Sequence, residues 1–267
     1  MVAQAPTTQT AGSIFVCALD VGGKANIGYF GQSYRCDDGS AIDGTVRTAA
    51  GSRSIREAVG DVIQAYDDQR AVALGLEAPC WLPRGLCFLE NEFLTARRFE
   101  GNRSWSAPVG GYVTTAGRAL MEEILSGIAE ERHEIAPTFG PQRPGMSRTP
   151  RSLWLWEAFV SGDGKPEPNV ESNPHVADAA CAVEAFVEVF LGENRDIQLM
   201  WPEKERVISL YGDALLSTRL VRPSANEWWR GSCAVVAPRR GGGLLHPRSS
   251  PPLAASEVEH PSGQERV

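Results

Sequence analysis

The sequence predicts an α/β protein in which helices flank a mixed β-sheet, with an antiparallel three-strand meander plus parallel strands. Short apolar runs alternate along the chain with longer segments whose apolar residues recur at helical spacing. The apolar runs contain few polar residues, which is typical of central strands covered on both faces. Three of these runs also end at or near a single carboxylate, namely Asp20, Glu77 and Glu157.

The bulk composition is that of an ordinary globular protein. Its 267 residues allow one large domain or two small ones. The formal net charge of −7 argues against a surface that binds nucleic acid everywhere. A local basic groove beside an acidic site remains compatible with that charge, because its distribution matters more than its sum.

The lack of a recognisable signal peptide and the spacing of the cysteines predict a cytoplasmic protein with no membrane partner. Residues 1–13 lack the basic region of a signal peptide, and the first apolar run contains Asp20. No apolar stretch approaches the roughly 20 residues that span a bilayer. The six cysteines form no CxxC pair, and several lie in apolar runs, where a reduced Cys behaves as a small hydrophobe.

The first half of the chain begins with the meander. An apolar strand over 14–20 ends in Asp20 and turns at Gly22 and Gly23. The next strands are predicted over 26–31 and, more weakly, over 41–48. An amphipathic helix over 54–68 and a second apolar strand over 71–77 follow; helical spacing returns over 112–133 after a stretch without clean periodicity over 80–110.

The second half continues the alternation. Residues 137–151 are rich in Pro, Gly and Arg and predict a loop, and 153–159 form a third apolar strand. A helix begins at His175, a further helix is predicted over 207–220, and a late strand over 232–236. We expect one domain over 14–237, with disordered segments over 1–13 and 238–267.

The acids give the clearest functional indication. Counting by twos from Asp20 gives Ala18 and Val16, so this carboxylate shares a face with buried residues and needs a partner. Carboxyl ends of parallel strands meet at one edge of a sheet, so Asp20, Glu77 and Glu157 should converge there with Asp178 of the helix. Such oxygen ligands suit Mg²⁺ or Mn²⁺, and two such ions can support phosphodiester hydrolysis.

Each of these residues also has a purely structural interpretation. A strand-terminal acid is commonly a turn or cap residue, and Asp178 could serve only the dipole of its helix. The arginines over 84–103 fit either a solvated surface loop or contacts with phosphate, and the aromatic residues among them fit a core. His175 fits a helix start, with activation of water as the alternative.

Several short motifs resemble RNase H-like nucleases. The segment 18–23, followed by Gly28 and Tyr29, resembles the first strand and turn of the RuvC resolvase branch, and 175–182 resembles its acidic final helix. The order of further segments is similar to that of the family called domain of unknown function 429. These segments are the acid-Ala-Pro segment 77–79, an arginine-bearing segment, the Glu157 strand, the Asp178 helix and the segment 209–216.

This resemblance covers roughly residues 14–237 and implies an RNase H-like fold and a metal-dependent nuclease of nucleic acid, DNA or RNA. The catalytic and metal-binding acids would be Asp20, Glu77, Asp178 and Glu157. The residues expected to contact substrate phosphate are Lys24, Arg97, Arg98 and Arg103. The chain departs from the pattern at Glu77, where the family would have Asp, and at His175, where the resolvases often carry a second acid; Glu157 would then supply the missing ligand.

Two alternatives stay open. The segment 20–24 also resembles the first phosphate loop of the sugar-kinase and actin-like phosphotransferases, but we find no second such loop before the glycines at 241–243. The other alternative is a non-catalytic RNase H-like scaffold that binds nucleic acid or protein and retains its acids for structure. The sequence leaves the oligomeric state undetermined.

Overall fold

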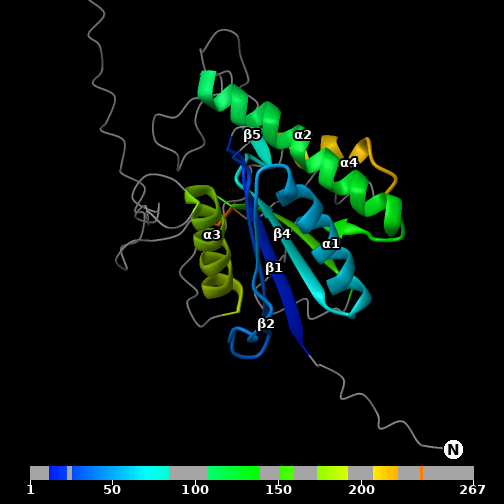
Figure 1. Ribbon diagram of the computed structural model, residues 1–267. Coiled ribbons are helices and arrows are strands. Elements are labelled where there is room, and N and C mark those ends of the chain that lie inside the picture. Colours follow the sequence, from blue (N-terminus) through cyan, green and yellow to red (C-terminus); the bar gives the residue numbers. More distant parts are fainter. Residues whose placement is uncertain are drawn as a thin grey trace, which may run out of the picture.

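A seven-stranded mixed β-sheet forms the centre of the protein, with strand order β3-β2-β1-β4-β7-β6 and β9 beside β7. Figure 1 shows this computed structural model, with helices on both sides of the sheet. The structure describes residues 12–22, 26–83, 108–138, 151–158, 173–191, 207–221 and 235–236. The α/β class and the mixed sheet are therefore confirmed.

The sheet combines an antiparallel half with a parallel half. β1 (Ser13–Asp20) pairs antiparallel with β2 (Gly28–Arg35), which pairs antiparallel with β3 (Arg47–Ala50). On its other edge β1 pairs parallel with β4 (Ala71–Leu76), which pairs parallel with β7 (Leu153–Ala158). All residues of β4 and β7 are buried, as expected for parallel strands with helices on both faces.

Helices cover the two faces unequally. α3 (Pro174–Phe190) lies along β1 and β2 on one face, which we call the α3 face. α1 (Arg53–Asp67) covers the opposite face, which we call the α1 face, and α2 (Pro108–Glu131) packs against α1. The short α4 (Leu210–Leu216) packs against α2 (Figure 1).

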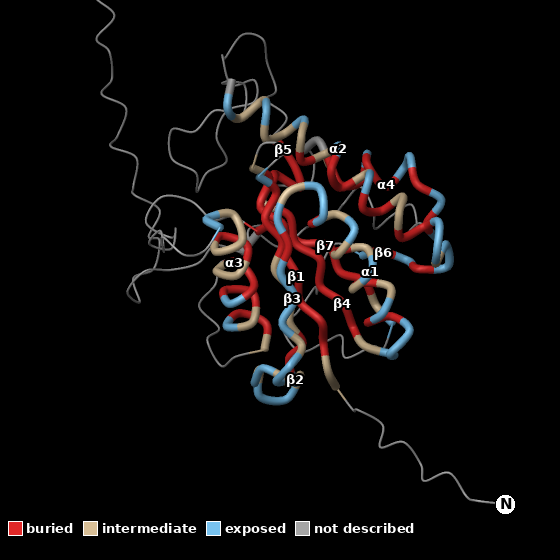
Figure 2. The backbone as a smooth tube through the Cα atoms, viewed as in Figure 1, coloured by how far each residue is buried: buried red, intermediate tan, exposed pale blue. Residues whose placement is uncertain are grey.

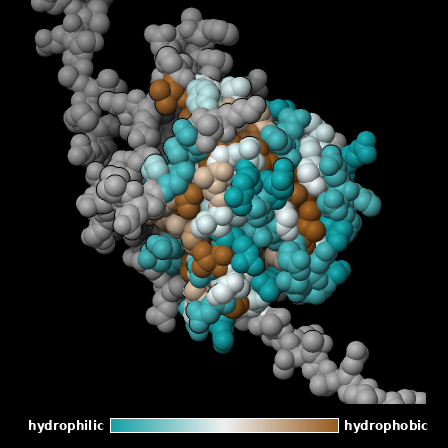
Figure 3. Space-filling view, viewed as in Figure 1, coloured by the Kyte–Doolittle hydropathy of each residue, from teal (hydrophilic) through white to brown (hydrophobic). Residues whose placement is uncertain are grey.

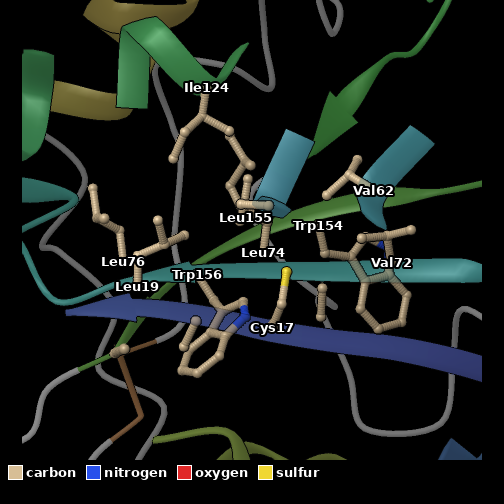
Figure 4. Packing of buried hydrophobic residues seen from close by; sticks show 14 of the residues in the cluster. Cys17, Leu19, Val62, Val72, Leu74, Leu76, Ile124, Trp154, Leu155 and Trp156 are labelled. Atoms are coloured by element: carbon tan, nitrogen blue, oxygen red, sulfur yellow. The ribbon is translucent and has the colours of Figure 1, made fainter. Parts of the chain in front are cut away.

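The core lies on both faces of the central strands, which are buried along most of their length (Figure 2). Leu19 and Leu76 lie on the same side of the sheet as Ile124 of α2, and Trp156 points to the other side (Figure 4). The Trp156 ring covers Gly75, where an added Cβ would come within 2.4 Å of it, and meets Phe186 of α3 at a centroid distance of 4.7 Å. Glycine is therefore required opposite this tryptophan.

Hydrophilic side chains cover much of the face seen in Figure 3, with hydrophobic residues in separate spots. Among the described residues, the large hydrophobic side chains that are exposed are Val46, Val109, Tyr112, Leu216 and Val221. Within the same residues, the helices are all too short or too polar to cross a membrane.

The structure differs from the predicted elements mainly around short strands. The third strand lies at 47–50 instead of 41–48, and Ala41 makes only an isolated bridge to Tyr34. The helix expected over 207–220 is instead β8 (Val207–Ser209) followed by α4, because β8 pairs with β5 (Trp81–Pro83). The Ser209 side chain then accepts a hydrogen bond from the Gly212 amide and caps α4.

Two further strands are very short. β6 (Pro137–Thr138) pairs with β7 inside the segment predicted as a loop. β9 (Val235–Val236) pairs parallel with the end of β7, in agreement with the predicted late strand. Of the segment 1–13 predicted as disordered, residues 12 and 13 are described, and Ser13 begins β1. Residues 1–11 and 238–267 lie outside the described residues, so the predictions of disorder there stay predictions.

Candidate metal centre

The centre is built around Asp20, the last residue of β1, which is buried at 5% exposure. In β2 its partner across the ladder is Gly28. An added Cβ at Gly28 would lie 2.1 Å from the carbonyl carbon of His175. The missing side chain therefore lets the start of α3 approach the end of β1.

The start of α3 carries two residues to Asp20. Asn173 caps the helix by accepting a hydrogen bond from the His175 amide. Pro174 occupies the first turn, where a backbone N–H would have no acceptor within the helix. His175 Nδ1 lies 2.6 Å from Asp20 Oδ2. Asp178 follows three residues later, on the same side of the helix, and is 7% exposed.

Glu77 reaches the same place from β4. Its amide donates to the Leu19 carbonyl at 2.8 Å, so the pairing of β4 with β1 continues one residue past Leu76. The Ala78 amide donates back to the Leu76 carbonyl at 2.8 Å and closes a γ-turn with Glu77 at its centre. This turn ends the strand at the level of Asp20.

Asp20, Glu77 and Asp178 converge as the sequence predicted. Each offers one carboxylate oxygen, and these oxygens all lie within 4.8 Å of one another. Three carboxylates so close repel one another unless a cation or a proton compensates their charge. These oxygens are hard donors, two of them from buried residues, and such a set suits a divalent cation such as Mg²⁺ or Mn²⁺.

Glu157 occupies a different place. In the register of the parallel strands it aligns with Leu76, which aligns with Leu19. Side chains alternate along a strand, so Glu157 lies on the α1 face, whereas Asp20 lies on the α3 face. Its Oε2 accepts a hydrogen bond from the Cys80 amide at 2.9 Å.

Glu157 is thus not a member of the group of acids that the structure brings together among the described residues. Its role as a fourth ligand stays a prediction. Lys24, Arg97, Arg98 and Arg103, the predicted phosphate contacts, lie outside the described residues.

The contact between His175 and Asp20 went unrecognised in the sequence. A signal for it existed, because His175 precedes Asp178 by three residues and therefore shares its helix face. The sequence placed this histidine at the start of the helix, with activation of water as an alternative role, but it did not indicate the contact with Asp20 that follows from the close approach at Gly28.

Comparison of the chain with family models, with curated proteins and with solved structures finds no match. The indications of function are therefore the geometry of the site and the motif resemblance.

Proposed function

We propose that this protein is a metal-dependent nuclease that hydrolyses phosphodiester bonds of nucleic acid, DNA or RNA, with Asp20, Glu77 and Asp178 as ligands of Mg²⁺ or Mn²⁺. The observation that carries the proposal is the convergence of these three acids within 4.8 Å from two strand ends and one helix. The meander β3-β2-β1 followed by parallel β4 and β7 supports the RNase H-like resemblance, in which acids gather at this edge.

A divalent cation bound here would supply Lewis acidity toward a phosphate oxygen and a more acidic water. The chain itself provides rigid placement. Asp20 and Glu77 are fixed at the ends of paired, buried strands, and Asp178 by a helix that is capped and packed on the sheet. His175 touches Asp20 and so restricts the orientation of that carboxylate.

The same histidine contact favours a second candidate, the non-catalytic scaffold. The His175 ring nitrogen, 2.6 Å from Asp20 Oδ2, gives this buried carboxylate a polar partner without a metal and leaves the acids a structural role. The phosphotransferase alternative gains no comparable support from the described residues, and its predicted phosphate loop over 20–24 includes residues 23 and 24, which lie outside them.

The test is a cleavage assay with Mg²⁺ or Mn²⁺ on single-stranded, duplex, hybrid and branched substrates. We expect metal-dependent cleavage of at least one substrate, and a rate at least about 100-fold lower in Asp20→Asn, because a metal contributes several kcal/mol to the transition state. The matched control is Asp61→Asn, which neutralises a half-buried carboxyl on the α1 face.

Three results would redirect the proposal. Folded wild-type protein that cleaves no substrate and shows no metal-dependent rise in melting temperature would contradict the nuclease. Binding of nucleic acid under those same conditions would support the scaffold. Stabilisation by ATP would support the phosphotransferase.

A further inference from the structure

The segment Glu77–Cys80 carries one proposed ligand, and it is held by residues on the α1 face. We propose that Tyr211 and Glu157 are positioning residues that fix this segment and thereby place the Glu77 carboxylate in the metal centre. The inference rests on the proposed function, since it concerns how one ligand of that centre is oriented. We call these two side chains, with the backbone of Leu210 and Tyr211, the clamp.

Tyr211 contacts the backbone on both sides of Glu77. It is the second residue of α4 and is completely buried. Its hydroxyl lies 3.3 Å from the Leu76 carbonyl and 3.2 Å from the Ala78 carbonyl, and its single proton is shared between these acceptors. One hydroxyl therefore restrains both peptide groups that flank the ligand.

Glu157 and α4 hold the other end of the segment. The Glu157 carboxylate accepts the hydrogen bond of the Cys80 amide, and it is 1% exposed. The Cys80 carbonyl accepts from the amides of Leu210 at 3.0 Å and Tyr211 at 3.4 Å. Both backbone groups of Cys80 are thus tied to the clamp, and a bond to a buried carboxylate is among the stronger ones.

Glu77 needs such support because the pairing of β4 with β1 ends at its amide. β4 stops at Leu76, and Glu77 lies in a γ-turn followed by Pro79, which has no N–H to donate. Its own amide bonds to Leu19, but the rest of the turn takes its anchoring from the α1 face. The Glu77 side chain meets Asp20 and Asp178 on the opposite side.

This arrangement gives Glu157 a function other than metal ligation. Its oxygen acts on the Cys80 amide, and through the backbone on the turn that presents Glu77. Groups that orient metal ligands in this way typically change metal affinity about 10–100-fold when removed. A conservative glutamine can keep the acceptor for the Cys80 amide, whereas a true ligand would lose its charge.

The experiment measures the Mn²⁺ dissociation constant of the full-length protein by titration, with free Mn²⁺ followed by electron paramagnetic resonance. We expect Tyr211→Phe and Glu157→Ala each to raise it about 10-fold. Glu157→Gln should bind nearly as the wild type does. The control is Tyr29→Phe, which removes the hydroxyl of an equally buried tyrosine that donates to Asp61 and should leave Mn²⁺ affinity unchanged while lowering the melting temperature.

The outcomes separate the two proposals. Wild-type protein that binds no Mn²⁺ would overturn the proposed function. Normal Mn²⁺ binding by the wild type together with unchanged affinity in Tyr211→Phe and Glu157→Ala would overturn the clamp alone. Loss of Mn²⁺ in Glu157→Gln as complete as in Asp20→Asn would make Glu157 a ligand and would also overturn its positioning role.

Discussion

Asp20 on the α3 face and Glu157 on the α1 face are both buried carboxylates near the same end of parallel strands, and their surroundings differ. Asp20 faces a histidine and two further acids that arrive from β4 and α3. Glu157 faces the Cys80 amide and the neighbourhood of α4. A shift of one residue along a strand reverses the face, so acids with similar positions in the sequence serve different partners.

The comparison shows that burial alone does not identify a ligand. Glu157 is less exposed than Asp20, yet only Asp20 belongs to the group of converging acids. What matters is which polar groups the same face brings within reach. On the α3 face these are other carboxylates, which favour a cation; on the α1 face the Cys80 amide donates a hydrogen bond to the Glu157 carboxylate.

The largest effect should come from filling the gap that admits α3. In Gly28→Ala the new methyl group would meet the His175 backbone, so α3 must shift and carry His175 and Asp178 away from Asp20. We expect roughly 1–3 kcal/mol of destabilisation, as for other overpacked sites, and a clear loss of Mn²⁺ affinity. Urea unfolding and Mn²⁺ titration measure the two effects.

Gly60→Ala is the matched control for that substitution. Gly60 is exposed within α1, and an added Cβ meets nothing within 4 Å. Alanine there should raise stability by about 0.5–1 kcal/mol through helix propensity and leave metal binding unchanged. If Gly28→Ala and Gly60→Ala had the same effects on stability and on Mn²⁺ affinity, the position of α3 would not depend on the missing side chain at Gly28.

A smaller effect is expected from the corresponding contact on the α1 face. In Gly117→Ala the added Cβ would lie 2.1 Å from the Ala78 Cβ, so α2 and the turn beside Glu77 must separate. Because the obstacle is one methyl group and not helix backbone, we expect about 1–2 kcal/mol of destabilisation and a weaker loss of Mn²⁺ affinity than in Gly28→Ala. A larger loss of Mn²⁺ affinity in Gly117→Ala than in Gly28→Ala would contradict the view that the centre depends more on the position of α3 than on that of α2.

Asp61 provides a pH-dependent test of the α1 face. It accepts a hydrogen bond from Tyr29 at 2.7 Å, and burial raises the pKa of Asp61 above its ordinary value, although the bond from Tyr29 opposes this. The folded protein then holds this proton more tightly than the unfolded chain, so stability decreases as pH rises from the unfolded to the folded pKa.

Asp61→Asn removes that dependence while keeping an acceptor for Tyr29. Relative to that of the wild type, its free energy of unfolding should therefore rise between pH 4 and pH 7. This rise should be smaller than the destabilisation expected from the glycine substitutions. Urea unfolding at both pH values measures this. If the free energy of unfolding of the variant instead fell relative to the wild type toward pH 7, Arg47 and Tyr29 would stabilise the charged form of Asp61 more than burial penalises it.

The smallest effect is expected at the exposed ion pair between the ends of α1 and α2. Arg132 Nη2 lies 2.6 Å from Asp67 Oδ2, and its hydrogen bond lowers the pKa of Asp67. This stabilisation is present above the unfolded pKa and is lost as pH falls through the folded one. Arg132→Gln should lower the melting temperature slightly at low salt and less at high salt, whereas a large, salt-independent loss would contradict a surface role.

The sequence was sufficient to predict the α/β class of the fold and the convergence of Asp20, Glu77 and Asp178. Asp20 and Glu77 close apolar runs, and strand ends of a parallel pair necessarily meet at one edge, so their convergence followed from pattern alone. The position of Asp178 on a buried helix could be predicted because the apolar residues of that helix are strongly periodic. These features depend on local sequence and on a general property of parallel sheets.

The face of Glu157 and the clamp could not be predicted in the same way. The face depends on the register of β7 against β4, which no local pattern fixes in a strand that is buried on both sides. The role of Tyr211 depends on the break between β8 and α4, where pairing with β5 overrode an apparently helical segment. Only the capping serine at Ser209 marked that helix start in the sequence.

The most direct test of the central claim is a Mn²⁺ titration of the wild type beside Asp20→Asn, Glu77→Gln, Asp178→Asn and Glu157→Gln, each checked for folding by its melting temperature. Acids on the α3 face should be indispensable, so the first three variants should lose the Mn²⁺ binding that the wild type and Glu157→Gln retain. Wild-type protein without Mn²⁺ binding, or folded α3-face variants that bind as the wild type does, would contradict a metal centre at Asp20, Glu77 and Asp178.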